Sequence, residues 1–100
     1  IQSGEIRGEV IHVDDFGNII TNIALKDLRE VGIEEGKNLL LILKKKGLTL
    51  RLCSAYGEVS SGMPLTIVGS SGFLEVAINR GNASQFFKSK AGDKITVKTV

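Results

Sequence analysis

The chain has 100 residues, 42% of them hydrophobic and 24% charged, which is typical of one soluble globular domain with a single core. Its net charge of +2, from 13 basic and 11 acidic side chains, is too weak to indicate nucleic-acid binding by itself. No apolar run approaches the roughly 20 residues of a membrane helix, and the first residues lack the layout of a signal peptide.

The first half of the chain reads as strands separated by polar turns. Residues 5–14 and 18–23 are predicted strands joined by a corner at Gly17, and residues 24–31 form a short helix at best. The run from 38 to 44 predicts a strand that is buried on both faces or lies at a subunit contact. Residues 45–47 predict a hairpin tip, and residues 48–54 the returning strand.

The second half continues the same pattern. Residues 65–69 and 73–79 are predicted strands around a turn at 70–72, and residues 95–100 a closing strand. Between them, Asn82 with Gln85 three residues later predicts the start of a short helix, which Phe86 and Phe87 would anchor. About seven short strands with little helix indicate an all-β class, either an antiparallel sandwich or a small closed barrel.

Nucleophile, base and metal arrangements are poorly represented. His12 is the single histidine, and a half-exposed strand position is the better interpretation than a catalytic one. Cys53 is the single cysteine and lies in an apolar run, which predicts a small buried hydrophobe. The sequence shows no metal-ligand spacing, and we expect a cytoplasmic protein. The start at Ile1 suggests a fragment of a longer chain.

The corner at residues 14–18 carries more recognition chemistry than a turn requires. It places two carboxylates, a ring, a glycine and a carboxamide in succession, Asp14-Asp15-Phe16-Gly17-Asn18. The Asn18 carboxamide matches the hydrogen-bonding edge of adenine, and Phe16 and Tyr56 could stack on a flat base for about 1–3 kcal/mol. Glu75 lies in an apolar strand, either at a solvent-facing edge or in a site. These side chains are suited to binding a ligand rather than to catalysing a reaction.

These stretches resemble the C-terminal domain of the S-adenosylmethionine hydroxide adenosyltransferase family, which also contains fluorinating and chlorinating enzymes. The resemblance covers nearly the whole chain and rests on Val13-Asp14-Asp15-Phe16-Gly17-Asn18-Ile19-Ile20-Thr21-Asn22-Ile23, Tyr56, Ser70-Ser71-Gly72-Phe73-Leu74-Glu75-Val76-Ala77-Ile78-Asn79 and Gly92-Asp93. It implies a small antiparallel, Greek-key-like β-barrel with one or two short helices. Residues 1–100 would then be a single C-terminal substrate-binding domain, separated from the N-terminal catalytic α/β domain of its parent.

The resemblance also implies an activity. The family attacks the ribose 5′ carbon of S-adenosyl-L-methionine, here with water or hydroxide, and releases adenosine and L-methionine. S-adenosyl-L-methionine is the substrate, and no cofactor is implied. The site would lie between the N-terminal domain of one subunit and the C-terminal domain of its neighbour in a homotrimer. Neither nucleic acid nor a membrane is an implied partner.

Carried over residue by residue, the resemblance implies a set of contacts but no catalytic residue and no metal ligand. Asn18 would bind adenine, with Phe16 and Tyr56 flanking the base. Asp14 would face the methionine amino group, and Ser70 the methionine end, in one turn with Ser71. The backbone around Ile78 would meet the adenine edge, with Glu75 close by.

Two positions depart from the family pattern. Gly69 stands where asparagine is expected, which weakens the argument for the Ser70 turn. Ser71 stands where the halogenating branch tends to have arginine, and the run from Leu74 to Ala77 is similar to the hydroxide-using branch. The sequence therefore favours a hydrolase over a halogenase, and we expect the isolated domain to be inactive.

Two hypotheses from other classes remain open. A β-barrel module for single-stranded nucleic acid is compatible with the scattered aromatic residues and with Lys44-Lys45-Lys46, although a solvated hairpin tip explains those lysines better. A purely structural oligomerisation domain is suggested by the apolar run from Leu39 to Leu43.

Overall fold

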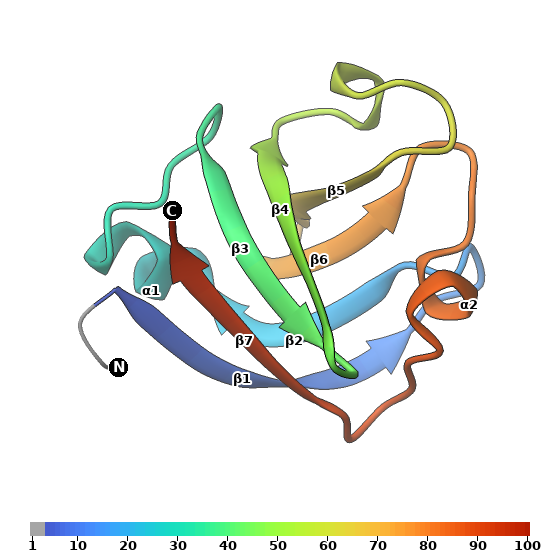
Figure 1. The fold of residues 1–100 in the computed structure, drawn as a ribbon, viewed down its shortest axis with the longest axis horizontal. Helices are drawn as coiled ribbons and strands as arrows, with labels where there is room; N and C mark the ends of the chain where they lie inside the picture. The colour runs from blue at the N-terminus through green and yellow to red at the C-terminus, as the bar shows by residue number, and fades with distance from the viewer. Residues whose placement is uncertain (1–3) are drawn as a thin grey trace.

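The computed structural model describes residues 4–100, in which seven strands close into one barrel with two short α-helices (Figure 1). The strands follow the order β1-β2-β6-β5-β4-β3-β7 around the barrel, and β7 pairs with β1 to close it. The all-β, small-barrel prediction is confirmed. The elements are β1 (Glu5–Val13), β2 (Ile19–Ala24), α1 (Leu25–Glu30), β3 (Asn38–Leu43), β4 (Lys46–Cys53), the 3₁₀ turn η1 (Tyr56–Glu58), β5 (Pro64–Val68), β6 (Phe73–Ile78), α2 (Ala83–Phe87) and β7 (Lys94–Thr99).

One pair of neighbouring strands is parallel, against the prediction of a fully antiparallel barrel. Leu52 lies opposite Thr66, and Cys53 opposite Ile67, so β4 and β5 run in the same direction. Parallel neighbours cannot be joined by a tight hairpin, because the chain must first return along the sheet. The connection over residues 54–63, which contains η1, makes this return (Figure 1).

The hairpin between β3 and β4 turns one residue earlier than predicted. Lys44 and Lys45 form the tip, with φ of 53° and 68°, while Lys46 pairs with Leu43 and Gly47 with Ile42. Two consecutive left-handed residues match the twist of the flanking strands, and Asn-Gly is the usual choice there. Because lysine rarely adopts this conformation, the sequence placed the tip wrongly at residues 45–47.

The barrel interior is filled by alternate residues of every strand. In β3, Leu39, Leu41 and Leu43 are fully buried, whereas Leu40 and Ile42 are half-buried on the outer face. The other buried hydrophobic residues of this cluster are Ile6, Val10, Ile19, Ile23, Leu28, Ile33, Leu50, Leu52, Leu74, Val76, Ala83, Phe87, Ile95 and Val97. The alternation in β3 shows that its apolar run is explained mainly by the barrel core.

Helix α2 closes one end of this core. Asn82 caps it as predicted, because its side-chain oxygen accepts a 2.9 Å hydrogen bond from the backbone N–H of Gln85. Phe87 is buried, but Phe86 is 43% exposed, with Lys46 Nζ 4.8 Å from its ring centroid. The prediction that both rings anchor the helix is therefore wrong for Phe86.

A second, smaller cluster lies on the outer face beneath the connection that follows β4. Cys53, Leu65 and Ala77 are buried there, with Val59 and Ile67 packed against them. Burial raises the pKa of the Cys53 thiol, which disfavours the reactive thiolate. The prediction that Cys53 is a buried hydrophobe is confirmed.

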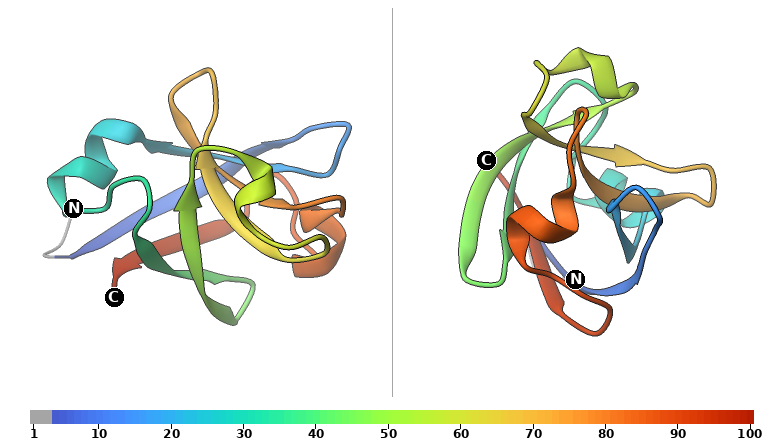
Figure 2. Two further views of the ribbon diagram at one scale, coloured as in Figure 1. Left: turned by 90° about the horizontal axis from the view of Figure 1, so that it is seen from above. Right: turned by 90° about the vertical axis from the view of Figure 1, so that its right-hand side faces the viewer.

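The two helices mark opposite ends of the barrel. The β1–β2 corner, the turn after β6 and α2 gather at one end, which faces the viewer in the right panel of Figure 2. Helix α1 lies at the other end, where β1 begins and β7 ends (Figure 1). Among the described residues, no helix has the length and apolar character needed to cross a membrane.

Candidate ligand-binding site

The β1–β2 corner is held by the first of its two acidic residues. Oδ1 of Asp14 accepts hydrogen bonds from the backbone N–H groups of Phe16 and Asn18, each 2.9 Å long. The backbone adds two further bonds, from Gly17 N to Asp14 O (3.0 Å) and from Asp14 N to Asn18 O (3.1 Å). An aspartate in this role favours a tight turn. Asp14 therefore fixes the backbone from which Phe16 and Asn18 project.

The corner is also docked against the start of α2. The backbone N–H of Ser84 donates to the carbonyl of Gly17 over 2.9 Å. Gly17 has φ of 84°, and a Cβ on it would overlap the side chain of Asn82, the residue that caps α2. Glycine is required here for both the conformation and the close approach. The corner and α2 are thereby fixed relative to each other.

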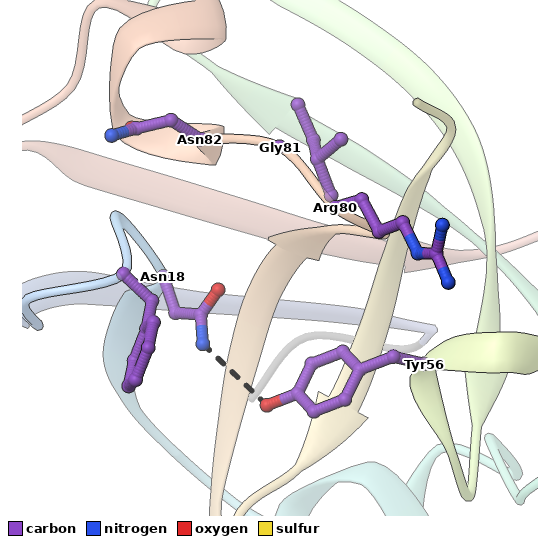
Figure 3. Close-up of a pocket in the computed structure, with 7 residues that line it drawn as sticks. Asn18, Tyr56, Arg80, Gly81 and Asn82 are labelled. Atoms are coloured by element: carbon purple, nitrogen blue, oxygen red, sulfur yellow. Dashed lines mark hydrogen bonds between the residues drawn. The ribbon is translucent and has the colours of Figure 1, made fainter. Parts of the chain in front are cut away.

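A cleft of about 600 Å³ opens at this end of the barrel, within the usual size range of small-molecule sites. Three segments line it: the corner, the start of η1 and the turn that follows β6 (Figure 3). Asn18 Nδ2 donates across it to the hydroxyl of Tyr56 over 3.5 Å. The lining residues are Phe16, Asn18, Tyr56, Ile78, Arg80, Gly81 and Asn82.

The chemistry of this lining suits binding rather than catalysis. Phe16 is 78% and Tyr56 42% exposed, so both rings are available to a flat ligand. The carboxamides of Asn18 and Asn82 offer paired donors and acceptors, although Asn82 Oδ1 already caps α2. Arg80 is the only charged residue among those lining the cleft, and none of them is a carboxylate, histidine or cysteine.

Two carboxylates lie close behind the cleft. Glu75 projects from the outer face of β6, between Ile20 of β2 and Ile67 of β5. Burial, and then the charge of Asp14, raise the pKa of Glu75. Burial, followed by the charges of Glu75 and Asp14, also raises the pKa of Tyr56, against a smaller lowering by the Asn18 hydrogen bond. The charges of both acids therefore act on the Tyr56 hydroxyl.

The structure brings together half of the predicted site residues. Phe16, Asn18, Tyr56 and Ile78 line the cleft, and Asp14 and Glu75 stand beside it. The two serines do not line it: Ser70 and Ser71 are exposed in the β5–β6 turn, at the opposite end of β6 from Ile78. Their predicted contact with the methionine end remains a prediction, as do the contacts carried over for the other residues.

Three lining residues, Arg80, Gly81 and Asn82, were not predicted as site residues. Asn82 was identified only as a helix cap. Arg80 adopts φ of 58°, an uncommon conformation outside glycine, and a Cβ on Gly81 would overlap the side chain of Ile78. Their position in the sequence could have indicated them, because these polar residues directly follow an apolar strand. That strand ends at the end of the barrel that holds the corner.

Other candidate chemistry lies elsewhere or is absent from the described chain. His12 is exposed on β1, where it pairs with Ile20 of β2. Within residues 4–100, no three His, Cys, Asp or Glu side chains come together as a potential metal site.

Fold and cleft together define a small β-barrel domain with a cleft lined by aromatic and carboxamide side chains at one end. The chain belongs to the SAM hydroxide adenosyltransferase C-terminal domain family, whose model matches residues 8–96. The family resemblance seen in the sequence is thereby confirmed.

Individual relatives agree with this assignment. The chain is 35% identical over 86 residues to an (R)-S-adenosyl-L-methionine hydrolase of Thermus thermophilus, covering 86% of this chain and 29% of the relative. It is 30% identical over 100 residues to a fluorinase of Actinoplanes sp., covering 97% and 34%. The solved structure of an uncharacterized conserved protein from Thermotoga maritima matches 98% of this chain and 37% of its own, at 33% identity and a TM-score of 0.93. The chain thus spans about a third of the length of these proteins.

Proposed function

We propose that this chain is the adenosine- and methionine-binding domain of a longer enzyme that cleaves S-adenosyl-L-methionine with water or hydroxide. The observation that carries the proposal is the convergence of Phe16, Asn18 and Tyr56 on one cleft of nucleoside size. The two rings offer flat apolar faces to a base, and the Asn18 carboxamide offers the donor and acceptor that an adenine edge requires. The named hydrolase relative supports this choice of substrate.

The proposed reaction needs little acid–base chemistry from this domain. The oxygen of water or hydroxide forms a bond to the ribose 5′ carbon while the bond from that carbon to sulfur breaks. The electron pair stays on sulfur, which becomes the neutral thioether of methionine, and an attacking water releases one proton to solvent. Because a sulfonium is already a good leaving group, orientation and partial desolvation of the nucleophile supply most of the catalysis.

This division of labour agrees with the composition of the cleft, which holds no general base among its lining residues. We propose that the groups that orient the nucleophile come from the rest of the parent enzyme, in a homotrimer that completes each site with a neighbouring subunit. The choice of water over halide rests on Ser71 and the run from Leu74 to Ala77. A fluorinase among the relatives keeps the halide branch as the alternative within the family.

Calorimetric titration with adenosine tests the proposed site. Replacement of Asn18 by alanine removes the side-chain donor and acceptor but keeps the backbone bonds of the corner, so adenosine affinity should fall about three- to tenfold. Asn38→Ala, an exposed asparagine on β3, is the matched control and should bind as the wild type does. Equal affinities for wild type and Asn18→Ala would remove Asn18 from the site.

A turnover assay tests the division of labour. Incubation of the 100-residue chain with S-adenosyl-L-methionine should release no adenosine, whereas the longer parent protein should release adenosine and L-methionine in equal amounts. Release of adenosine by the 100-residue chain alone would show that the reacting groups lie in this domain. Release of a 5′-halo-adenosine by the parent in the presence of halide would instead assign it to the halogenating branch.

A further inference from the structure

Arg80 is a charged residue whose presence in the cleft the proposed function leaves unexplained. It follows β6 with φ of 58°, a conformation that is uncommon in residues other than glycine. Within the described residues, its guanidinium takes part in no ion pair with any carboxylate. Figure 3 shows the side chain extending along the cleft toward the end of Tyr56 that joins the backbone.

The negative charges lie at the other end of Tyr56. Its hydroxyl points to Asn18, whose backbone is held by Asp14. Glu75 pairs with Ile20 of β2, two residues after Asn18, so both carboxylates lie on the side of the cleft where the Tyr56 hydroxyl meets Asn18. The cleft therefore has an electrostatic polarity, with a guanidinium at one end and two carboxylates behind the other.

We propose that Arg80 is a specificity-determining residue that sets the balance between the cationic substrate and the neutral product, and that orients both along the cleft. The inference rests on the proposed function, because it takes S-adenosyl-L-methionine and adenosine as the ligands. The electron-rich purine lies between Asn18, which meets its edge, and the guanidinium, which can stack on it or donate to its ring nitrogens. The sulfonium and ammonium groups lie toward Asp14 and Glu75.

The Arg80 charge changes the binding affinities of the two ligands differently. S-adenosyl-L-methionine carries a net positive charge at neutral pH, so the Arg80 charge opposes its binding, while adenosine is neutral and gains only the contact to its base. Arg80 thus narrows the difference in affinity between substrate and product. It also disfavours the reversed orientation, in which the sulfonium would lie against the guanidinium.

The test compares two affinities in each of several variants. Adenosine and S-adenosyl-L-methionine are titrated into the 100-residue chain, and KM for S-adenosyl-L-methionine and Ki for adenosine are measured on the longer parent protein. Arg80→Gln should raise the preference for S-adenosyl-L-methionine over adenosine about three- to tenfold at low salt, and added salt should shrink this change. Arg80→Lys keeps the charge and should keep most of the wild-type ratio.

Arg29→Gln is the matched control, because it removes the same charge from an exposed arginine on α1, at the opposite end of the barrel. Its ratio should equal that of the wild type. If wild type binds adenosine but Arg80→Gln leaves the ratio unchanged, the role of Arg80 is overturned while the proposed function stands. If neither the chain nor the parent binds adenosine or S-adenosyl-L-methionine, the proposed function fails and the role of Arg80 fails with it.

Discussion

The carboxylate of Glu75 occupies the space above Gly69 in which any side chain at position 69 would have to sit. The two residues are brought together by the β5–β6 hairpin, where the backbone N–H of Gly69 donates to the carbonyl of Phe73 over 3.0 Å. Gly69 does not adopt a left-handed conformation, so a side chain here conflicts only with the position of the Glu75 carboxylate. Glycine stands here instead of the expected asparagine, and because it has no side chain it leaves room for the Glu75 carboxylate.

Gly69→Ala should displace the Glu75 carboxylate with little loss of stability. A carboxylate is the flexible end of its side chain and can move away, so the free energy of unfolding should change by less than about 1 kcal/mol. A carboxylate pushed toward solvent loses part of the burial that raises its pKa, so the pKa of Glu75 should fall. NMR titration of the Glu75 carboxyl carbon measures this. Gly47→Ala, where a Cβ meets only ordinary contact, is the control, and an unchanged Glu75 titration in Gly69→Ala would refute the prediction.

The raised pKa of Glu75 should make Glu75→Gln more stable than the wild type at neutral pH. The folded protein keeps the Glu75 proton to a higher pH than the unfolded chain does, so stability falls as pH rises from the ordinary glutamate pKa through the raised one. The glutamine variant avoids this loss, and its advantage should disappear below that window. Urea unfolding at a series of pH values measures the difference.

Glu58→Gln should show the opposite sign in the same experiment. Hydrogen bonds from Ser54 lower the pKa of Glu58, so this carboxylate contributes stability above the ordinary glutamate pKa, and the contribution is lost as pH falls through the lowered value. Glu58→Gln should therefore be less stable than the wild type at neutral pH. Curves of the same sign for the two variants would contradict the assigned environments.

Gly17→Ala should destabilise the protein more than Gly32→Ala. Both glycines have a left-handed φ, of 84° and 83°, so both substitutions incur about 1–2 kcal/mol of backbone strain. A Cβ on Gly32 meets nothing within 4 Å, but one on Gly17 overlaps the Asn82 cap of α2. Loss of that cap adds about 1 kcal/mol. Equal unfolding free energies for the two variants would show that the corner does not depend on its contact with α2.

Phe87→Ala and Phe86→Ala should differ sharply although the residues are adjacent. Phe87 is fully buried, and removing a buried phenylalanine costs about 3–5 kcal/mol. Phe86 is largely outside the core, packed edge-to-face on Phe87 and under Lys46, and its removal should cost less than about 1.5 kcal/mol. Thermal and urea unfolding of the two variants provide the comparison, and similar losses would reject the assignment of Phe86 to the surface.

The sequence predicted the class of fold because local patterns decide most of it. Apolar alternation located the strands, and the Asn82 cap located α2. The parallel β4–β5 pair could not be predicted, since strand direction depends on how residues 54–63 cross the barrel. The sequence did not show which of Phe86 and Phe87 is buried. The buried face of so short a helix is decided by how the helix packs on the barrel.

The candidate site was predictable where residue type alone indicated binding. A ring and a carboxamide in one tight corner singled out Phe16 and Asn18, and both line the cleft. Arg80 was missed because its place in the cleft depends on its left-handed backbone and on the pairing of β2 with β6, which brings the turn after β6 beside the corner. Neither property is visible in the order of the residues.

Strand β7 lines no part of the cleft, yet it closes the barrel at whose end the cleft lies. It pairs with β3 and with β1, where Lys98 lies opposite Glu5, so the ring joins segments from nearly opposite ends of the chain. Contacts at such separation are slow to form, because a long loop must be ordered before they contribute stability. Until β7 pairs with both of its neighbours, the remaining strands form an open sheet whose edges are β1 and β3. Unpaired edges are a template for pairing with other chains, so the pairing of residues 94–99 also protects the barrel from aggregation.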